Sequence, residues 1–254
     1  MKVREAKKTR TSYPNKMSKI KNATAESVLK RKAKKIIQIL EKEYGIPKRE
    51  TEQDDPLEEL VRTILSQNTN DINRDRALKS LHKHFLSWKD VVEADHNAVA
   101  EAIRVGGLAD QKARRIQSAL RWAYEKFGDY SLKPLKTMPA DEVYDMLRSL
   151  DGVGPKTSAI VMLFSLGKPY FPVDTHIHRV ATRLGLLPDN TNAEKAHEIL
   201  SELVSKKKYY SAHLNLITHG RRVCLARKPA CDECSLRKLC TWRKANQGAA
   251  GGIL

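Results

Sequence analysis

Apolar side chains recur every three or four residues along most of this chain, and polar residues fill the positions between them. That spacing puts the apolar positions on one face of an α-helix. The clearest stripes are Leu57, Leu60, Val61, Ile64 and Leu65; Ile116, Ala119, Leu120, Ala123 and Phe127; Val143, Met146, Leu147 and Leu150; and Ala196, Ile199, Leu200, Leu203 and Val204. The alternation typical of half-buried strands is nowhere sustained. The pattern therefore predicts an all-α protein.

Residues typical of helix boundaries flank these stripes. Asp55 suits an N-cap and Pro56 the first helical position, while Gly128 follows the last apolar residue of the second stripe. Asp174 precedes another helical pattern, which ends at Gly185. We therefore expect helices joined by short turns.

The composition favours a soluble globular protein. The chain has 254 residues, 41% of them apolar, which is enough for one large or two small domains. It has no run of about 18 apolar residues, as a membrane span requires, and its N-terminus lacks the apolar core of a signal peptide. We expect no membrane partner and a location on the reducing side of the membrane.

Positive charge is concentrated at the start of the chain. The formal net charge is +17, and residues 1–35 carry thirteen Lys or Arg against two Glu. Such an arm favours a polyanion, of which nucleic acid is the commonest. A solubilising tail over residues 1–22 is the alternative explanation.

All four cysteines lie within one short segment, in the spacing C-x6-C-x2-C-x5-C. They are Cys224, Cys231, Cys234 and Cys240. This clustering argues against a disulfide scaffold, which spreads cysteines along the chain. Four thiolates so close together bind either a structural zinc ion or an iron–sulfur cluster, and the spacing alone does not choose between them. Arg227 and Lys228 lie in the first loop of the segment, where they suit contacts to phosphates.

The segment "LDGVGPKTSA" places Gly152, Val153 and Gly154 between two helical patterns. Two glycines permit a tight hairpin with positive φ and leave backbone N–H groups accessible. Those groups, at the start of the next helix, can bind a phosphate oxygen without reading the base sequence. An ordinary joint between two helices would have the same pattern.

Lys156 and Asp174 are the candidate chemical groups. Lys156 lies in the first turn after the hairpin, and a neutral lysine is a nucleophile that can form a Schiff base with a sugar carbon. Asp174 follows 18 residues later, where a carboxylate could orient an amine or stabilise positive charge on a sugar. A surface lysine and a simple N-cap are the alternatives. His176 and His178 are two residues apart and face away from each other on a helix, so we do not predict a metal pair.

Together these segments resemble the endonuclease III family, which are DNA glycosylases of the helix–hairpin–helix superfamily. The hairpin, "VDTHIHRV" after it, and the cysteine cluster carry the resemblance, and "ILSQNTND" and "GGLADQKARRI" are similar to two further family segments. The resemblance spans roughly residues 28–243. It implies a two-domain all-α fold, with a DNA-binding cleft between a six-helix block and a cluster domain.

The resemblance also implies domain boundaries and a cofactor. The six-helix block would span residues 50–168, and the cluster domain would combine residues 28–49 with 169–243 and hold a [4Fe–4S] cluster. Residues 1–27 would form a flexible basic arm and residues 244–254 a flexible tail.

For the site, the resemblance implies that Lys156 is the nucleophile and Asp174 its partner. Such enzymes excise oxidised pyrimidines such as thymine glycol and cut the strand on its 3′ side by elimination through a Schiff base. The partner would be double-stranded DNA containing damaged bases or abasic sites, bound by a monomer in the cytoplasm at the nucleoid, or in the nucleus of a eukaryote. The implied DNA contacts are Gln67, Asn68, Leu108, Gly152, Val153, Gly154, Thr157, His176, Arg179, Arg227 and Lys228.

Two wedges, one polar and one apolar, would fill the gap that an extruded base leaves. Leu108 is similar to the family's apolar wedge, and Asn68 takes the place of its polar wedge, although Gln67 is one residue away and remains an alternative.

The sequence departs from the family at two positions. Pro155 stands where an arginine is usual, and Asp151 where a proline is usual. Neither removes the chemistry, but both change the charge near DNA. Two other functions stay open: a glycosylase without lyase activity, of the mismatch or uracil type, and a non-catalytic hairpin module that only binds DNA.

Overall fold

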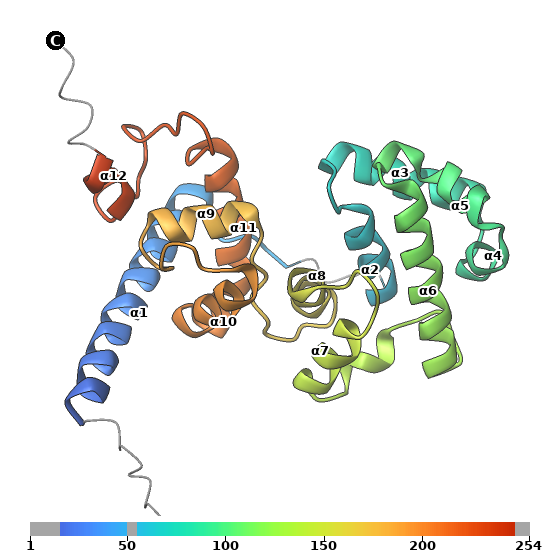
Figure 1. Cartoon of the computed structure of the whole chain (residues 1–254), viewed down its shortest axis with the longest axis horizontal. Helices are drawn as coiled ribbons and strands as arrows, with labels where there is room; N and C mark the ends of the chain where they lie inside the picture. The colour runs from blue at the N-terminus through green and yellow to red at the C-terminus, as the bar shows by residue number, and fades with distance from the viewer. Residues whose placement is uncertain (1–15, 50–54, 247–254) are drawn as a thin grey trace, which may run out of the picture.

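The computed structural model describes residues 16–49 and 55–246 of the chain, and within them all regular structure is helical (Figure 1). The all-α prediction is confirmed. The α-helices are α1 (Lys16–Tyr44), α2 (Pro56–Leu65), α3 (Asp71–His84), α4 (Trp88–Glu93), α5 (His96–Ala102), α6 (Ala109–Phe127), α7 (Ala140–Arg148), α8 (Pro155–Ile160), α9 (Thr175–Arg183), α10 (Ala193–Leu203), α11 (Tyr209–Arg222) and α12 (Thr241–Asn246). Short 3₁₀ turns are η1 (Arg104–Gly106), η2 (Lys133–Lys136) and η4 (Lys206–Lys208), and η3 (Val161–Ser165) is a π-helical turn. None of these described helices combines the length and apolar character that crossing a membrane requires.

Three predicted helix boundaries are found in the structure. Asp55 accepts a hydrogen bond from the backbone N–H of Leu57 at 3.0 Å, with Pro56 as the first residue of α2. Asp174 caps α9 in the same way. Gly128 ends α6 with a φ of 73°, a conformation that glycine adopts without strain.

Buried apolar side chains form two separate clusters. The first takes its residues from α2–α7, the hairpin before α8 and η3, and runs from Leu57 to Leu166. The second combines α1 with α9–α11 and the segment that leads to Leu236. Figure 1 shows the two groups of helices on either side of α8. The chain thus leaves one group after α1 and returns to it after η3.

The segment η3 belongs to both clusters. Val161 and Met162 are buried in the first, whereas Leu163 is buried in the second. A π-turn advances the chain by more residues per turn than an α-helix does, so consecutive side chains can reach both sides. Arg49, which follows α1 where the chain leaves the second cluster, donates a hydrogen bond to the carbonyl oxygen of Leu163. This bond joins the segment after α1 to η3, where the chain returns.

Two helices reach into the segments that are expected to form the arm and the tail. Helix α1 begins at Lys16, so it covers the later part of residues 1–27. The segment lacks a clear apolar stripe, but no Gly or Pro interrupts residues 16–44 and good helix formers are frequent. An ion pair of 2.6 Å between Lys30 and Glu26 adds i,i+4 support. Helix α12 likewise extends into the expected tail, and residues 1–15 and 247–254 lie outside the described part of the chain.

Candidate active site

A cleft of about 1030 Å³ lies between the two groups of helices. The end of α2 and the loop after it form one wall, the hairpin before α8 forms the floor, and α9 and α11 form the opposite wall. Of the residues expected at the site, Gln67, Asn68, Gly152, Gly154, Lys156, Asp174, His176 and Arg179 all line this cleft. Segments far apart in the sequence are therefore brought to one place.

The hairpin is shaped by Gly152. Its φ is 71°, and a Cβ added there would overlap the side chain of Arg115 from α6. Gly154 caps α8 with open space around it, and Pro155 is the first residue of that helix. Pro155 therefore fits the helix start well, as its fixed φ and missing N–H suit this position.

Lys156 and Asp174 enter the cleft from different clusters. Lys156 is exposed in the first turn of α8, and Asp174 is half-buried at the start of α9. The Oδ1 atom of Asp174 accepts the backbone N–H of Ile177 at 2.7 Å, which fixes the orientation of the carboxylate. Asp174 is thus both the cap that the sequence predicts and a carboxylate that faces the same space as the amine.

His213 of α11 lies in the wall of the cleft, and no pattern in the sequence singles it out. It is 4% exposed, and its Nδ1 atom is 2.9 Å from the carbonyl oxygen of Pro172. Burial lowers the pKa of His213 to about 4, and the charges of Asp174 and Lys156 raise and lower it, respectively. The imidazole is therefore neutral near pH 7 and close enough to sense both groups.

Gln67 and Asn68, the two polar candidates for the wedge, differ in how their side chains are held. The amide of Gln67 donates to the carbonyl oxygen of Gly152 at 2.9 Å and accepts from Arg115 at 2.8 Å. Asn68 is exposed in a left-handed conformation with a φ of 51°. Gln67 therefore ties its loop to the hairpin, which leaves Asn68 as the residue at the tip.

Four of the expected DNA contacts are placed differently from the others. Val153 is 4% exposed and Thr157 5%, so their side chains are enclosed by the protein. Arg179 donates to the carbonyl oxygens of Cys224 (3.1 Å) and Gly220 (2.8 Å), so its guanidinium ties α9 to α11. Leu108 is 51% exposed with a φ of 49° but is not part of the cleft lining. The sequence pattern located these residues without revealing which way their side chains point.

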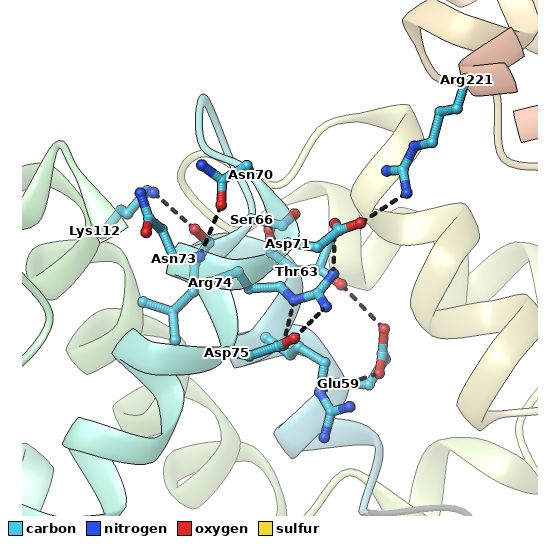
Figure 2. Close-up of polar contacts among 12 residues, drawn as sticks. Glu59, Thr63, Ser66, Asn70, Asp71, Asn73, Arg74, Asp75, Lys112 and Arg221 are labelled. Atoms are coloured by element: carbon cyan, nitrogen blue, oxygen red, sulfur yellow. Dashed lines mark hydrogen bonds and ion pairs between the residues drawn. The ribbon is translucent and has the colours of Figure 1, made fainter. Parts of the chain in front are cut away.

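An ion pair spans the cleft between α3 and α11. Asp71 accepts from Arg221 of the opposite wall at 2.7 Å and from Arg74 of its own helix at 3.0 Å (Figure 2). Arg74 also pairs with Asp75 at 2.8 Å. The arginines at this edge are thus held by neighbouring carboxylates.

The four cysteines line one small pocket and are unpaired. The Nη1 atom of Arg183 is 3.4 Å from the sulfur of Cys224, and the backbone N–H of Arg243 is directed at the sulfur of Cys240 at the same distance. Such donors stabilise metal-bound thiolates. Burial raises the pKa of Cys234 to about 11, so a bound metal is needed to hold it as a thiolate.

The number of thiols at this pocket suits two kinds of metal group. An iron–sulfur cluster takes four cysteine thiolates spread over its irons, and a structural zinc ion also takes four. The four thiols at this pocket have the donor chemistry that either group needs. Arg183 also donates to the carbonyl oxygens of Leu225 (2.6 Å) and Ala226 (3.0 Å), which fixes the loop that exposes Arg227 and Lys228.

Two parts of the sequence match known families. Residues 61–206 match the HhH-GPD superfamily of base excision DNA repair proteins, and residues 224–240 match the iron-sulfur binding domain of endonuclease III.

Relatives from different kingdoms share the match. The chain is 33% identical over 195 residues to endonuclease III of Thermotoga maritima, which covers 76% of this chain and 87% of that protein. Over 189 residues it is 31% identical to the Escherichia coli endonuclease III, covering 74% and 85%. It is 37% identical over 172 residues (68% of this chain) to the "Putative DNA glycosylase At3g47830" of Arabidopsis thaliana, and spans 59% of that protein's length.

Solved structures share the fold. One of a trapped covalent intermediate of endonuclease III with DNA has a TM-score of 0.74 at 27% identity, covering 86% of this chain and 98% of that one. A thermostable thymine-DNA glycosylase has a TM-score of 0.69 at 25% identity, covering 85% and 98%. The helical fold, the hairpin and the sequence matches define a base excision DNA repair protein of the HhH-GPD superfamily. Within it, the chain belongs to the endonuclease III family of DNA glycosylases.

We expect Gly152→Ala to destabilise the protein by about 1 to 3 kcal/mol, because it combines backbone strain with displacement of Arg115. Gly154→Ala is the matched control, since its added methyl group meets open space. Urea unfolding of both variants measures the difference. Equal stability of the two would show that the hairpin does not depend on the left-handed conformation of Gly152.

We also expect the free energy of unfolding to fall as the pH decreases from about 6.5 to 4. His213 has a lowered pKa in the folded protein, so over this range the unfolded chain binds the proton and the folded chain does not. Stability is therefore lost on acidification. His213→Gln keeps a donor for the Pro172 carbonyl but does not titrate, so it should flatten this dependence by about 1 to 3 kcal/mol. The exposed His84→Gln is the control, and an unchanged slope in His213→Gln would contradict the assignment.

Proposed function

We propose that this protein excises oxidised pyrimidines from double-stranded DNA and cuts the strand on the 3′ side of the resulting abasic site. The observation that carries the proposal is that an exposed lysine and an oriented carboxylate, Lys156 and Asp174, face one cleft from opposite sides. The cleft is large enough to take an extruded nucleotide.

DNA is held mainly through its backbone. The N–H groups of the hairpin, at the positive end of α8, bind a phosphate next to the lesion. His176, in the wall of the cleft, and the exposed Arg227 and Lys228 add contacts to the strand. Asn68 and Leu108, at two exposed loop tips with left-handed backbones, fill the gap in the stack.

Lys156 then acts as the nucleophile. Its amine forms a bond to C1′ of the deoxyribose while the bond from C1′ to the base breaks, and the base leaves with the bonding electrons. Asp174 accepts a proton from the attacking amine and stabilises the positive charge that develops on the sugar. Opening of the ring at O4′ gives an imine between Lys156 and C1′. Loss of a C2′ proton expels the 3′ phosphate and cuts the strand.

His213 supports this chemistry by staying neutral. A protonated imidazole beside Lys156 and Asp174 would compete for the carboxylate and repel the positive charge on the sugar. Burial of His213 keeps that competing charge away at the pH of the cell.

The cysteine segment holds a [4Fe–4S] cluster in this proposal. Its ligands are Cys224, Cys231, Cys234 and Cys240, which line one pocket with N–H donors directed at two of the sulfurs. The cluster supplies a rigid crosslink that fixes the loop with Arg227 and Lys228 against α9. The protein acts as a monomer wherever chromosomal DNA is kept.

A glycosylase without lyase activity is the second candidate, because the fold is also similar to that of a thymine-DNA glycosylase. The two functions differ in the need for an amine: only the bifunctional enzyme uses Lys156 to form an imine.

Borohydride trapping on a duplex with one thymine glycol separates these functions. We expect a covalent adduct with the wild-type protein and none with Lys156→Ala, while Asp174→Asn should slow base release by about 100-fold or more. Lys126→Ala, on the exposed end of α6, is the control and should trap like wild type. Base release by wild type without an adduct would favour the second candidate, and binding without base release would leave a module that only holds DNA.

A further inference from the structure

Lys112 of α6 is fully buried, and neither the proposed chemistry nor the DNA contacts use it. Its exposed fraction is 0%. Lysine is almost never buried in this way unless its charge is compensated. The Nζ atom donates to two backbone carbonyl oxygens, that of Leu65 at 2.7 Å and that of Gly106 at 2.8 Å. Burial lowers the pKa of Lys112 to about 8.

The two carbonyl oxygens that Lys112 binds both belong to the last residue of a helical segment. Leu65 is the last residue of α2, and Gly106 is the last residue of η1. The C-terminal ends of helices carry unpaired carbonyls and partial negative charge. One ammonium group thus caps two helical segments at once, and Figure 2 shows it reaching the turn at the end of α2 beside Ser66.

Each capped segment leads directly to one of the two loop tips. The chain continues from Leu65 to Asn68 in three residues and from Gly106 to Leu108 in two. Gly106 packs closely against α3, because an added Cβ would lie 3.2 Å from the Cβ of Ala77. Lys112 is therefore the polar link between the bases of the two loops.

We propose that Lys112 is a positioning residue: it fixes the spacing of Asn68 and Leu108, so that both side chains enter the DNA stack together. The inference rests on the proposed function, in which these two residues fill the gap left by the extruded base. Without the ammonium, two buried carbonyls lose their donor and the loops separate. Lys156 and Asp174 lie on α8 and at the start of α9 and make no contact with Lys112, so their chemistry should survive.

A general structural role for Lys112 would have a different consequence. Loss of stability lowers every activity of the protein in parallel. Loss of loop spacing lowers only the steps in which a gap in a duplex is filled. Single-stranded DNA with an abasic site has no such gap, so its cleavage separates the two explanations.

The first measurement uses a duplex with a tetrahydrofuran abasic analogue opposite 2-aminopurine, whose fluorescence rises when it is unstacked. We expect a clear rise with wild type and with the control Lys126→Met, which makes the same change at an exposed position of α6. Lys112→Met should give little rise at saturating protein. If Lys112→Met does not fold, Lys112→Gln takes its place, since an amide can still donate to one carbonyl and should give an intermediate rise.

The second measurement compares two cleavage reactions of the same variants. Lys112→Met should slow single-turnover cleavage of a thymine glycol duplex by about 100-fold, the order expected when the bound substrate is misplaced by about 1 Å. Cleavage of a single strand with a natural abasic site should stay within about twofold of wild type. Equal losses in both reactions, or an unchanged fluorescence rise, would overturn the proposal. Failure of the proposed function is distinguishable, because wild type itself would then form no borohydride adduct.

Discussion

The geometry of the cleft depends on how five consecutive residues, Val161–Ser165, pack into two hydrophobic clusters at once. Lys156 lies one turn before this segment and Asp174 nine residues after it. The amine is carried by one cluster and the carboxylate by the other, so their relative position is set by this junction. A small movement of one helix would therefore not separate Lys156 from Asp174. Separation would require the two clusters to move apart.

Within the described part of the chain, two ion pairs connect the helices of one cluster to those of the other, Asp71 with Arg221 and Arg148 with Glu194. The ion pair of Asp71 with Arg221 leaves about half of each side chain accessible, and such pairs contribute about 0 to 1 kcal/mol. The aromatic contacts of Phe164 with Tyr210 and His213 lie deeper, at ring-centroid distances of 5.2 Å and 5.4 Å. The cleft is therefore held from its floor by η3 and Phe164, while the ion pair contributes mainly at the mouth, where DNA would displace or surround it.

Three sets of hydrogen bonds position the groups that would touch DNA. Arg115 and Gln67 tie one loop to the hairpin, Lys112 links that loop to the next, and Arg183 holds the cysteine loop. In each case a long polar side chain binds a backbone carbonyl at the base of a loop or within its turn. These hydrogen bonds help to fix the loops that carry the exposed tips.

Much of this arrangement could be predicted from the sequence, because it rests on local rules. Helix periodicity gave the elements, Asp55 and Asp174 gave helix starts, and the glycine spacing gave the hairpin. The family resemblance added the cysteine cluster's role. The start of α1 at Lys16 was not predicted, because this part of the chain has no clear apolar stripe. His213 and Lys112 were missed because their importance comes from partners 41 and 47 residues away in the chain, and burial of a polar residue has no local sequence signal. The burial of Thr157 and the internal bonds of Arg179 escaped for the same reason.

Peptide mapping of the borohydride-reduced complex tests the central claim most directly. After digestion of the protein and the DNA, mass spectrometry locates the residue that carries the sugar remnant. The account predicts a single modified peptide that contains Lys156. A remnant on another lysine or on the N-terminal amine, with Lys156 unmodified, would contradict it.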